Sequence, residues 1–168
     1  MPLTAFTRSF SACLAALVLA AAAPAILAEE TGEPVPPTLT DKNGLAIEGY
    51  DPVAYFPEAD GKPVRGDKDL TATHHGATYR FVSEANRERF LANPDTYAPA
   101  YGGYCAFAMA DGQKVTINPK SYEIHDGRLY LFYRDWFTNT LKPWKKDRDT
   151  LRPAADGHWE EILEDLKK

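Results

Sequence analysis

The clearest structural signal in the chain is Tyr122-Glu123-Ile124-His125-Asp126-Gly127-Arg128-Leu129-Tyr130-Leu131-Phe132-Tyr133. Aromatic and β-branched residues lie on both sides of an Asp-Gly dipeptide, which favours the tight turn between two antiparallel strands. The segment therefore predicts a β-hairpin that turns at Asp126-Gly127. Another strand is expected just before it, from Val115 to Ile117.

A second hairpin is predicted earlier in the chain, where β-branched and aromatic residues alternate with polar ones in residues 70–73 and 77–82. The two runs flank His74-His75-Gly76. Because successive side chains of a strand point to opposite faces, we expect His74 and His75 to point in opposite directions. At most one of them would then face a given site.

Helices are predicted on both sides of these hairpins. Asp51-Pro52 suits the N-cap and first position of a short helix, and a further helix is expected from Glu84 to about Ala92. Residues 135–168 have a helical periodicity interrupted by Pro143, Pro153 and Gly157. The pattern predicts an α+β fold, in which a small antiparallel sheet with β-hairpins packs against short helices and a helical segment ends the chain.

Composition limits the classes of function. The 168 residues include 19 Lys and Arg against 24 Asp and Glu, for a net charge of −5. A phosphate backbone needs clustered cations, so the composition argues against a nucleic-acid partner. An acidic surface also disfavours anionic membranes as a general partner.

The first residues have the layout of a bacterial-type signal peptide. Arg8 precedes an apolar run, and small residues follow it before Glu29. We expect cleavage after Ala28, or else after Ala25, and export to the periplasm with no transmembrane segment in the mature protein. Residues 29–40 are then expected to form a disordered leader, and residues 41–168 a single domain.

Cys105 is the one cysteine expected in the mature protein. Of the two cysteines, Cys13 opens the apolar run of the signal peptide and leaves with it. Cys105 is then the lone thiol of an exported protein, in a compartment that usually favours paired cysteines. An unpaired thiol there calls for a functional explanation.

The chain resembles the exported branch of the YHS-domain family, which is related to the TRASH-type modules of heavy-metal ATPases and metal sensors. The residues that carry the resemblance are Gly49-Tyr50-Asp51-Pro52-Val53-Ala54-Tyr55-Phe56, Asn93-Pro94, Tyr101-Gly102-Gly103-Tyr104-Cys105-Ala106 and Asp126-Gly127. The metal-binding branch of the family carries cysteines where this chain has Ala54, Val82 and Asn86. The thiolate site of that branch therefore cannot form here.

The resemblance instead directs attention to Cys105, because some relatives carry selenocysteine at the matching position. Met109 follows four residues later and would share a helical face with Cys105, and a thiolate with a thioether suits Cu(I). His74 or His75 could supply an imidazole ligand. The alternative interpretation gives these residues no metal-binding role: Cys105 would be a buried thiol, Met109 a core residue, and the two histidines solvated residues of the turn. A polar pocket lining is also expected, from Tyr50, Asp51, Tyr101 and Tyr104.

The leading hypothesis is a periplasmic protein that binds or traffics a soft metal, with copper as the expected metal, through Cys105, rather than an enzyme. Its partners would be a metal ion or a small ligand and another metal-handling or redox protein. The alternative is a thiol-based redox protein whose Cys105 reacts with peroxide or with the disulfide of a partner. The third hypothesis is that a small organic ligand binds in a pocket lined by the thiol.

Overall fold

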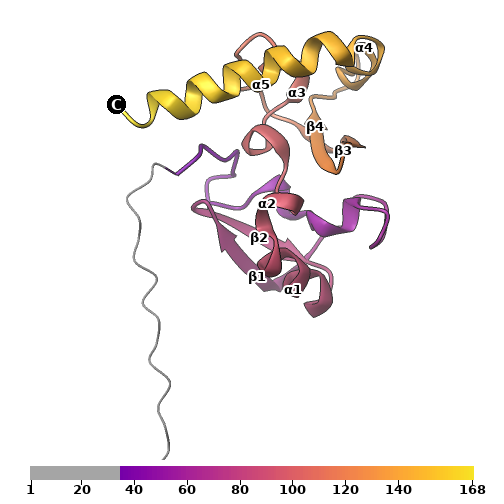
Figure 1. Cartoon of the computed structure of the whole chain (residues 1–168). Helices are drawn as coiled ribbons and strands as arrows, with labels where there is room; N and C mark the ends of the chain where they lie inside the picture. Colours follow the sequence, from indigo (N-terminus) through magenta and orange to yellow (C-terminus); the bar gives the residue numbers. More distant parts are fainter. Residues whose placement is uncertain (1–34) are drawn as a thin grey trace, which may run out of the picture. The chain divides into compact units, whose positions relative to one another are not determined.

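The structure is a computed structural model that describes residues 35–168 (Figure 1). The predicted signal peptide, residues 1–28, and the start of the predicted leader lie outside this range. Within it, the elements in chain order are η1 (Ile47–Gly49), η2 (Val53–Tyr55), β1 (Asp67–His74), β2 (Ala77–Phe81), α1 (Glu84–Ala92), α2 (Pro94–Tyr97), η3 (Ala100–Gly103), α3 (Ala106–Met109), β3 (Asn118–His125), β4 (Arg128–Phe132), α4 (Leu141–Lys146) and α5 (Arg148–Asp165). No helix in this part is long and apolar enough to cross a bilayer.

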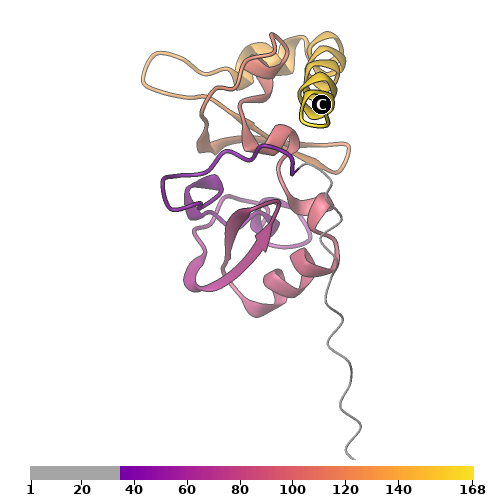
Figure 2. The same ribbon diagram turned by 90° about the vertical axis from the view of Figure 1, so that its left-hand side faces the viewer.

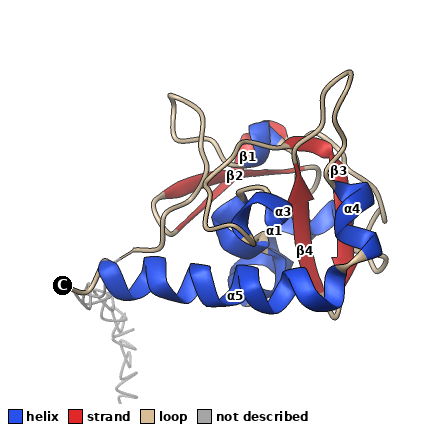
Figure 3. Ribbon diagram, turned by 90° about the horizontal axis from the view of Figure 1, so that it is seen from above, coloured by secondary structure: helices blue, strands red, loops and turns tan. Residues whose placement is uncertain are grey.

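The α+β class predicted from the sequence is confirmed, with a difference in the strands. The described residues form two separate two-stranded antiparallel sheets, β1–β2 and β3–β4, instead of one small sheet (Figure 3). Residues 115–117, predicted as a strand, are irregular, and β3 begins only at Asn118. Val115 instead uses its carbonyl to accept a hydrogen bond from the Cys105 amide, at 2.9 Å.

Both hairpins turn in the same way. His74 pairs with Ala77 across one turn, and His125 pairs with Arg128 across the other. The two turn residues have positive φ in each case, 48° and 71° at His75-Gly76 and 49° and 71° at Asp126-Gly127. Two consecutive positive φ angles are the signature of a type I′ turn, whose twist matches that of the strands.

Strand β4 divides the interior into two clusters of buried side chains. Leu129 and Leu131 pack in the first cluster, with the side chains of β1, β2 and α1. Tyr130 and Phe132 pack in the second, with Trp144 of α4 and residues of α3 and α5. Alternate residues of a strand point to opposite sides, so the apolar run Leu129–Phe132 can fill one core with every second residue and the other core with the rest.

The C-terminal segment departs from the expected breaks. Helix α5 runs without interruption through Pro153 and Gly157, and the break in the segment falls at Asp147, between α4 and α5 (Figure 1). Ala155 is fully buried in the second cluster, and Leu151 and Trp159 pack beside it. This tertiary packing on both sides of Pro153 compensates for the hydrogen bond that a proline cannot donate.

Residues 35–40 of the expected leader lie against the domain. The Leu39 amide donates to the Gly102 carbonyl at 2.8 Å, and Thr40 forms a bridge with Ala46. Gly102 has a φ of +60°, and a Cβ there would lie 2.0 Å from the carbonyl oxygen of Pro37. A glycine at this position therefore lets the incoming chain pass directly over the Tyr-Gly-Gly-Tyr-Cys motif.

Candidate functional site

Cys105 lies at the start of α3 and is completely buried in the first cluster. The Tyr133 amide donates a hydrogen bond to its sulfur at 3.3 Å. Thr140 Oγ1 lies 3.4 Å from the same sulfur and donates its own proton to the Tyr133 carbonyl at 3.0 Å. The thiol is therefore the donor toward Thr140, and its proton and a sulfur lone pair are both used within the fold.

These contacts explain the unpaired thiol by structure rather than by reactivity. The connection from β4 to α4 begins at Tyr133 and ends at Thr140, and the sulfur hydrogen-bonds to both residues. A nucleophilic thiol has to be reached by its target, and this one is enclosed. The geometry gives no support to the redox alternative.

We expect Cys105 to be unreactive toward a thiol reagent such as 5,5′-dithiobis(2-nitrobenzoate) in the native state. Full labelling of one thiol per chain, in the form that begins at Glu29, should require denaturant, because only unfolding exposes the sulfur. Absorbance of the released chromophore measures the reaction. Rapid labelling of the native protein would contradict the buried placement and revive the redox alternative.

Met109 does not join Cys105. Its side chain is fully buried in the second cluster, with Tyr130, Phe132 and Trp144, whereas Cys105 belongs to the first. Helix α3 is only four residues long, from Ala106 to Met109. Met109 is thus placed as a core residue, where its flexible side chain fits among aromatic rings.

A different set of side chains comes together at the tip of the first hairpin. His74 Nε2 lies 3.1 Å from Asp95 Oδ1, and His75 Nε2 lies 3.7 Å from the same oxygen. One ligand atom of each of the three side chains lies within 4.8 Å of the other two. Among the described residues, this is the group of His, Cys, Asp and Glu side chains that could share a metal ion.

The expectation that only one of the two histidines could face a site is wrong. Strand β1 ends at His74, so His75 belongs to the turn and not to the alternating strand. The left-handed conformation of His75 turns its ring back over that of His74, and the two ring centroids lie 3.8 Å apart. Strand alternation therefore does not apply between them.

Asp95 was not predicted as a site residue. It follows Pro94 at the start of α2, and 21 positions separate it from His74. Its carboxylate is 86% exposed, whereas the side chain of His74 is 16% exposed and packs edge-on against Phe90. Only the tertiary packing of α1 and α2 against the hairpin brings the carboxylate to the histidines.

The charge state of His74 suits metal binding. Burial lowers the pKa of His74 below its usual value, and the neighbouring His75 lowers it further, while Asp95 opposes both effects. His74 is therefore mostly neutral at neutral pH. A neutral imidazole offers the lone pair that a metal ion requires.

The cluster borders a hollow of about 170 Å³, whose walls include residues of the expected leader and of the glycine motif. Three aromatic side chains line it, Tyr79, Tyr101 and Trp159. Arg128 and the Tyr101 hydroxyl both donate to Asp156 Oδ1, at 3.1 and 2.9 Å. The two histidines and Asp95 thus lie at the edge of this hollow.

The expected polar pocket around Cys105 does not form from its four residues. Tyr101 lines the hollow just described. Asp51 is buried beneath η2 and accepts hydrogen bonds from Val53 and Asn86. Tyr50 is buried under the guanidinium of Arg65, 4.8 Å away, and Tyr104 packs against the second cluster. The four side chains thus lie in different parts of the fold and do not line one pocket.

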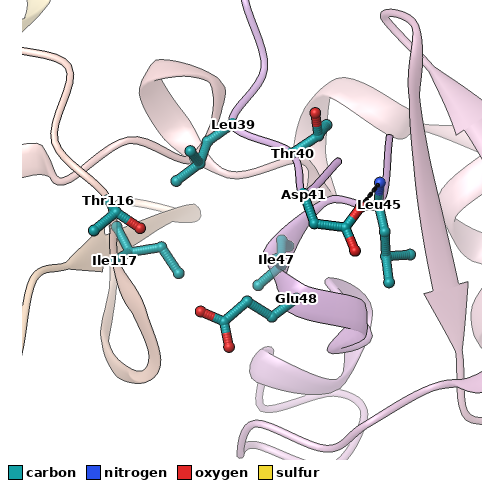
Figure 4. Close-up of a pocket in the computed structure, with 9 residues that line it drawn as sticks. Leu39, Thr40, Asp41, Leu45, Ile47, Glu48, Thr116 and Ile117 are labelled. Carbon is teal, nitrogen blue, oxygen red and sulfur yellow. Dashed lines mark hydrogen bonds between the residues drawn. The ribbon is translucent and has the colours of Figure 1, made fainter. Parts of the chain in front are cut away.

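A second hollow, of about 180 Å³, lies between residues 39–48 and residues 116–117 (Figure 4). Its walls are largely aliphatic, with the carboxylates of Asp41 and Glu48 at the sides. Asp41 is occupied by its own loop, since Oδ1 accepts from the Leu45 amide at 2.9 Å. No residue predicted for a site lines this hollow.

Comparison with known proteins adds nothing to this geometry. No family model, no curated protein and no solved structure matches the chain. The resemblance to exported YHS-domain proteins therefore stays a prediction that rests on the motifs of the sequence.

Proposed function

We propose that the protein binds a single divalent copper ion at His74, His75 and Asp95, as an exported metal-binding or metal-trafficking protein. The observation that carries the proposal is the convergence of both histidine Nε2 atoms on one carboxylate oxygen, at 3.1 and 3.7 Å. Atoms that bind one ion at about 2.0–2.1 Å lie about 3 Å apart. Small rotations of the exposed His75 and Asp95 side chains complete the site.

The ligand set favours Cu(II) over Cu(I). Two imidazoles and a carboxylate are borderline and hard ligands, whereas Cu(I) prefers thiolate and thioether. Among divalent first-row metals, nitrogen and oxygen ligands bind Cu(II) most tightly and Zn(II) less so. Copper, the metal expected from the sequence, therefore remains the proposed metal. Its proposed ligands lie at the tip of the first hairpin instead of at Cys105.

Calorimetric titration of the form that begins at Glu29 tests this function. We expect one Cu(II) per chain at about pH 7.5 and weaker binding at about pH 5.5, because protons compete for the imidazoles. The lowered pKa of His74 has a defined sign: protons compete for this imidazole only at a lower pH than they would for an ordinary histidine, so its contribution to binding is lost late as the pH falls. Binding that is unchanged at the lower pH would contradict imidazole ligation.

His125 provides a matched control. Its Nε2 lies 3.4 Å from Asp126 Oδ2, also beside a type I′ turn, but no second imidazole accompanies it. The substitution His125→Gln should leave the Cu(II) affinity unchanged. A large loss would show that copper binds elsewhere than at the first hairpin.

A further inference from the structure

Two aromatic side chains stand out of the protein on the loop between β4 and α4. Trp136 is 97% exposed and Phe137 is 99% exposed. The other exposed large apolar residues of the described part reach 56% at most. In Figure 2 this connection, in pale orange, projects beyond the neighbouring elements.

The loop that carries them has a defined shape. Asp135 Oδ1 accepts hydrogen bonds from the amides of Phe137 and Thr138, at 2.9 and 2.6 Å. Asp135 Oδ2 accepts from the Tyr133 hydroxyl at 2.7 Å, and the Asp135 amide donates to the Thr138 carbonyl. Arg134 and Asn139 close the base of the loop by a strand-like bridge. The fold thus holds the two rings in water, although burying them would be favourable.

The surroundings of the two rings are basic. Trp136 borders a hollow that is otherwise lined by Asn118, Lys120, Arg134 and Asp135. The Asp135 carboxylate keeps its negative charge, so two cations, Lys120 and Arg134, face one carboxylate there. Lys142, Lys145 and Lys146 follow on helix α4, where Lys145 Nζ lies 3.9 Å from Glu123 Oε1. With Lys120 from β3, the surface beside Trp136 therefore carries a small excess of positive charge in a chain whose net charge is −5.

We propose that this loop docks the protein on the surface of an anionic phospholipid bilayer, with Trp136 and Phe137 inserted at the interface. Aromatic rings concentrate at the level of the lipid headgroups, and Lys120 and Arg134 would meet the phosphates. A protein partner would instead be met by an apolar patch with a polar rim, whereas here the apolar surface is limited to two protruding rings. The acidic remainder is repelled by the same lipids, which orients the molecule.

Vesicle flotation tests the proposal with the form that begins at Glu29, which keeps every described residue. We expect binding to vesicles of phosphatidylglycerol and phosphatidylcholine, weaker binding in high salt, and a blue shift of tryptophan emission. The shift should vanish in Trp136→Phe, because Trp144 is fully buried and Trp159, on α5, packs against the second cluster. The double substitution Trp136→Ala and Phe137→Ala should weaken binding at least about tenfold. Removing the Lys120 or Arg134 charge with Gln should cost about fivefold each.

Leu91→Ala is the control, since Leu91 is an exposed apolar residue on α1 and should leave vesicle binding unchanged. Circular dichroism verifies that the loop variants stay folded. Two results would overturn the proposal. One is wild-type protein that does not float with anionic vesicles, or floats equally well with the double substitution. The other is self-association without lipid that the double substitution abolishes, which would assign the rings to a contact between copies of the chain.

Discussion

Substitution of Asp51 by Ala lowers the free energy of unfolding by about 4 kcal/mol, enough to unfold a marginally stable domain. The carboxylate is fully buried and accepts four hydrogen bonds. Oδ1 accepts from the amides of Val53 and Ala54, at 2.8 and 3.3 Å. Oδ2 accepts from the Val82 amide and from Asn86 Nδ2, both at 2.8 Å. One side chain thus joins η2, the end of β2 and α1.

The size of this effect follows from the donors left behind. Each buried donor that loses its acceptor costs about 1–3 kcal/mol, and three of these donors are backbone amides that cannot move away. Asp51→Asn should cost less but remain destabilising, because its NH₂ group would face one of the donors. Urea unfolding followed by circular dichroism measures both variants.

Asp41 gives the matched comparison. Its Oδ1 also accepts from two backbone amides, those of Asn43 and Leu45, but it is exposed to water. Water can replace the lost acceptor, so Asp41→Ala should destabilise the protein much less than Asp51→Ala. Equal losses in the two variants would show that Asp51 is not the buried junction described here.

Substitution of His75 by Asn is expected to weaken copper binding while the protein stays folded. We expect the Cu(II) affinity to fall by about tenfold to a hundredfold or more, because one of three ligands is lost. His75 has a φ of 48°, and Asn before Gly is the preferred pair for a type I′ turn. The melting temperature of the metal-free variant should therefore equal or exceed that of the wild type. Isothermal titration calorimetry measures the affinity, and differential scanning calorimetry measures the melting temperature.

This variant separates a ligand role from a structural one. A His75→Asn protein with lower stability and unchanged copper affinity would show that His75 serves the turn alone. His74→Ala is less informative, because His74 also packs against Phe90 and its loss combines both effects.

The local structure could be predicted from short stretches of sequence. The Asp126-Gly127 hairpin and the hairpin around His75-Gly76 follow from turn chemistry and alternation, and both are confirmed. The α1 helix, Glu84–Ala92, is confirmed, and Ser83 caps it by accepting a hydrogen bond from the Asn86 amide. These features depend on neighbours within a few residues, which a single sequence displays.

The site depends on contacts that a single sequence does not display. Asp95 reaches His74 across 21 positions, and Thr140 reaches the Cys105 sulfur across 35. The prediction that His74 and His75 point in opposite directions was wrong, because the strand ends at His74 and His75 lies in the turn. A strand boundary is the least certain feature of a sequence pattern, and here it decides whether two imidazoles can share an ion.

The same limit applies to Cys105. Its lack of a partner cysteine, and the resemblance to relatives with selenocysteine at this position, favoured chemistry at the sulfur. The sequence does not show that the connection from Tyr133 to Thr140 would close over the thiol and use both its donor and its acceptor. A lone cysteine can therefore persist as a thiol because the fold encloses its sulfur.

Electron paramagnetic resonance of the protein with one equivalent of Cu(II) tests the central claim most directly. The proposed site predicts one Cu(II) species bound by imidazole nitrogens, with the nitrogen splitting altered in His75→Asn and unchanged in His125→Gln and Cys105→Ser. An identical resonance spectrum in His75→Asn would contradict the claim. So would an absorption spectrum with a sulfur-to-copper charge-transfer band that is lost in Cys105→Ser, which would assign the metal to the thiol.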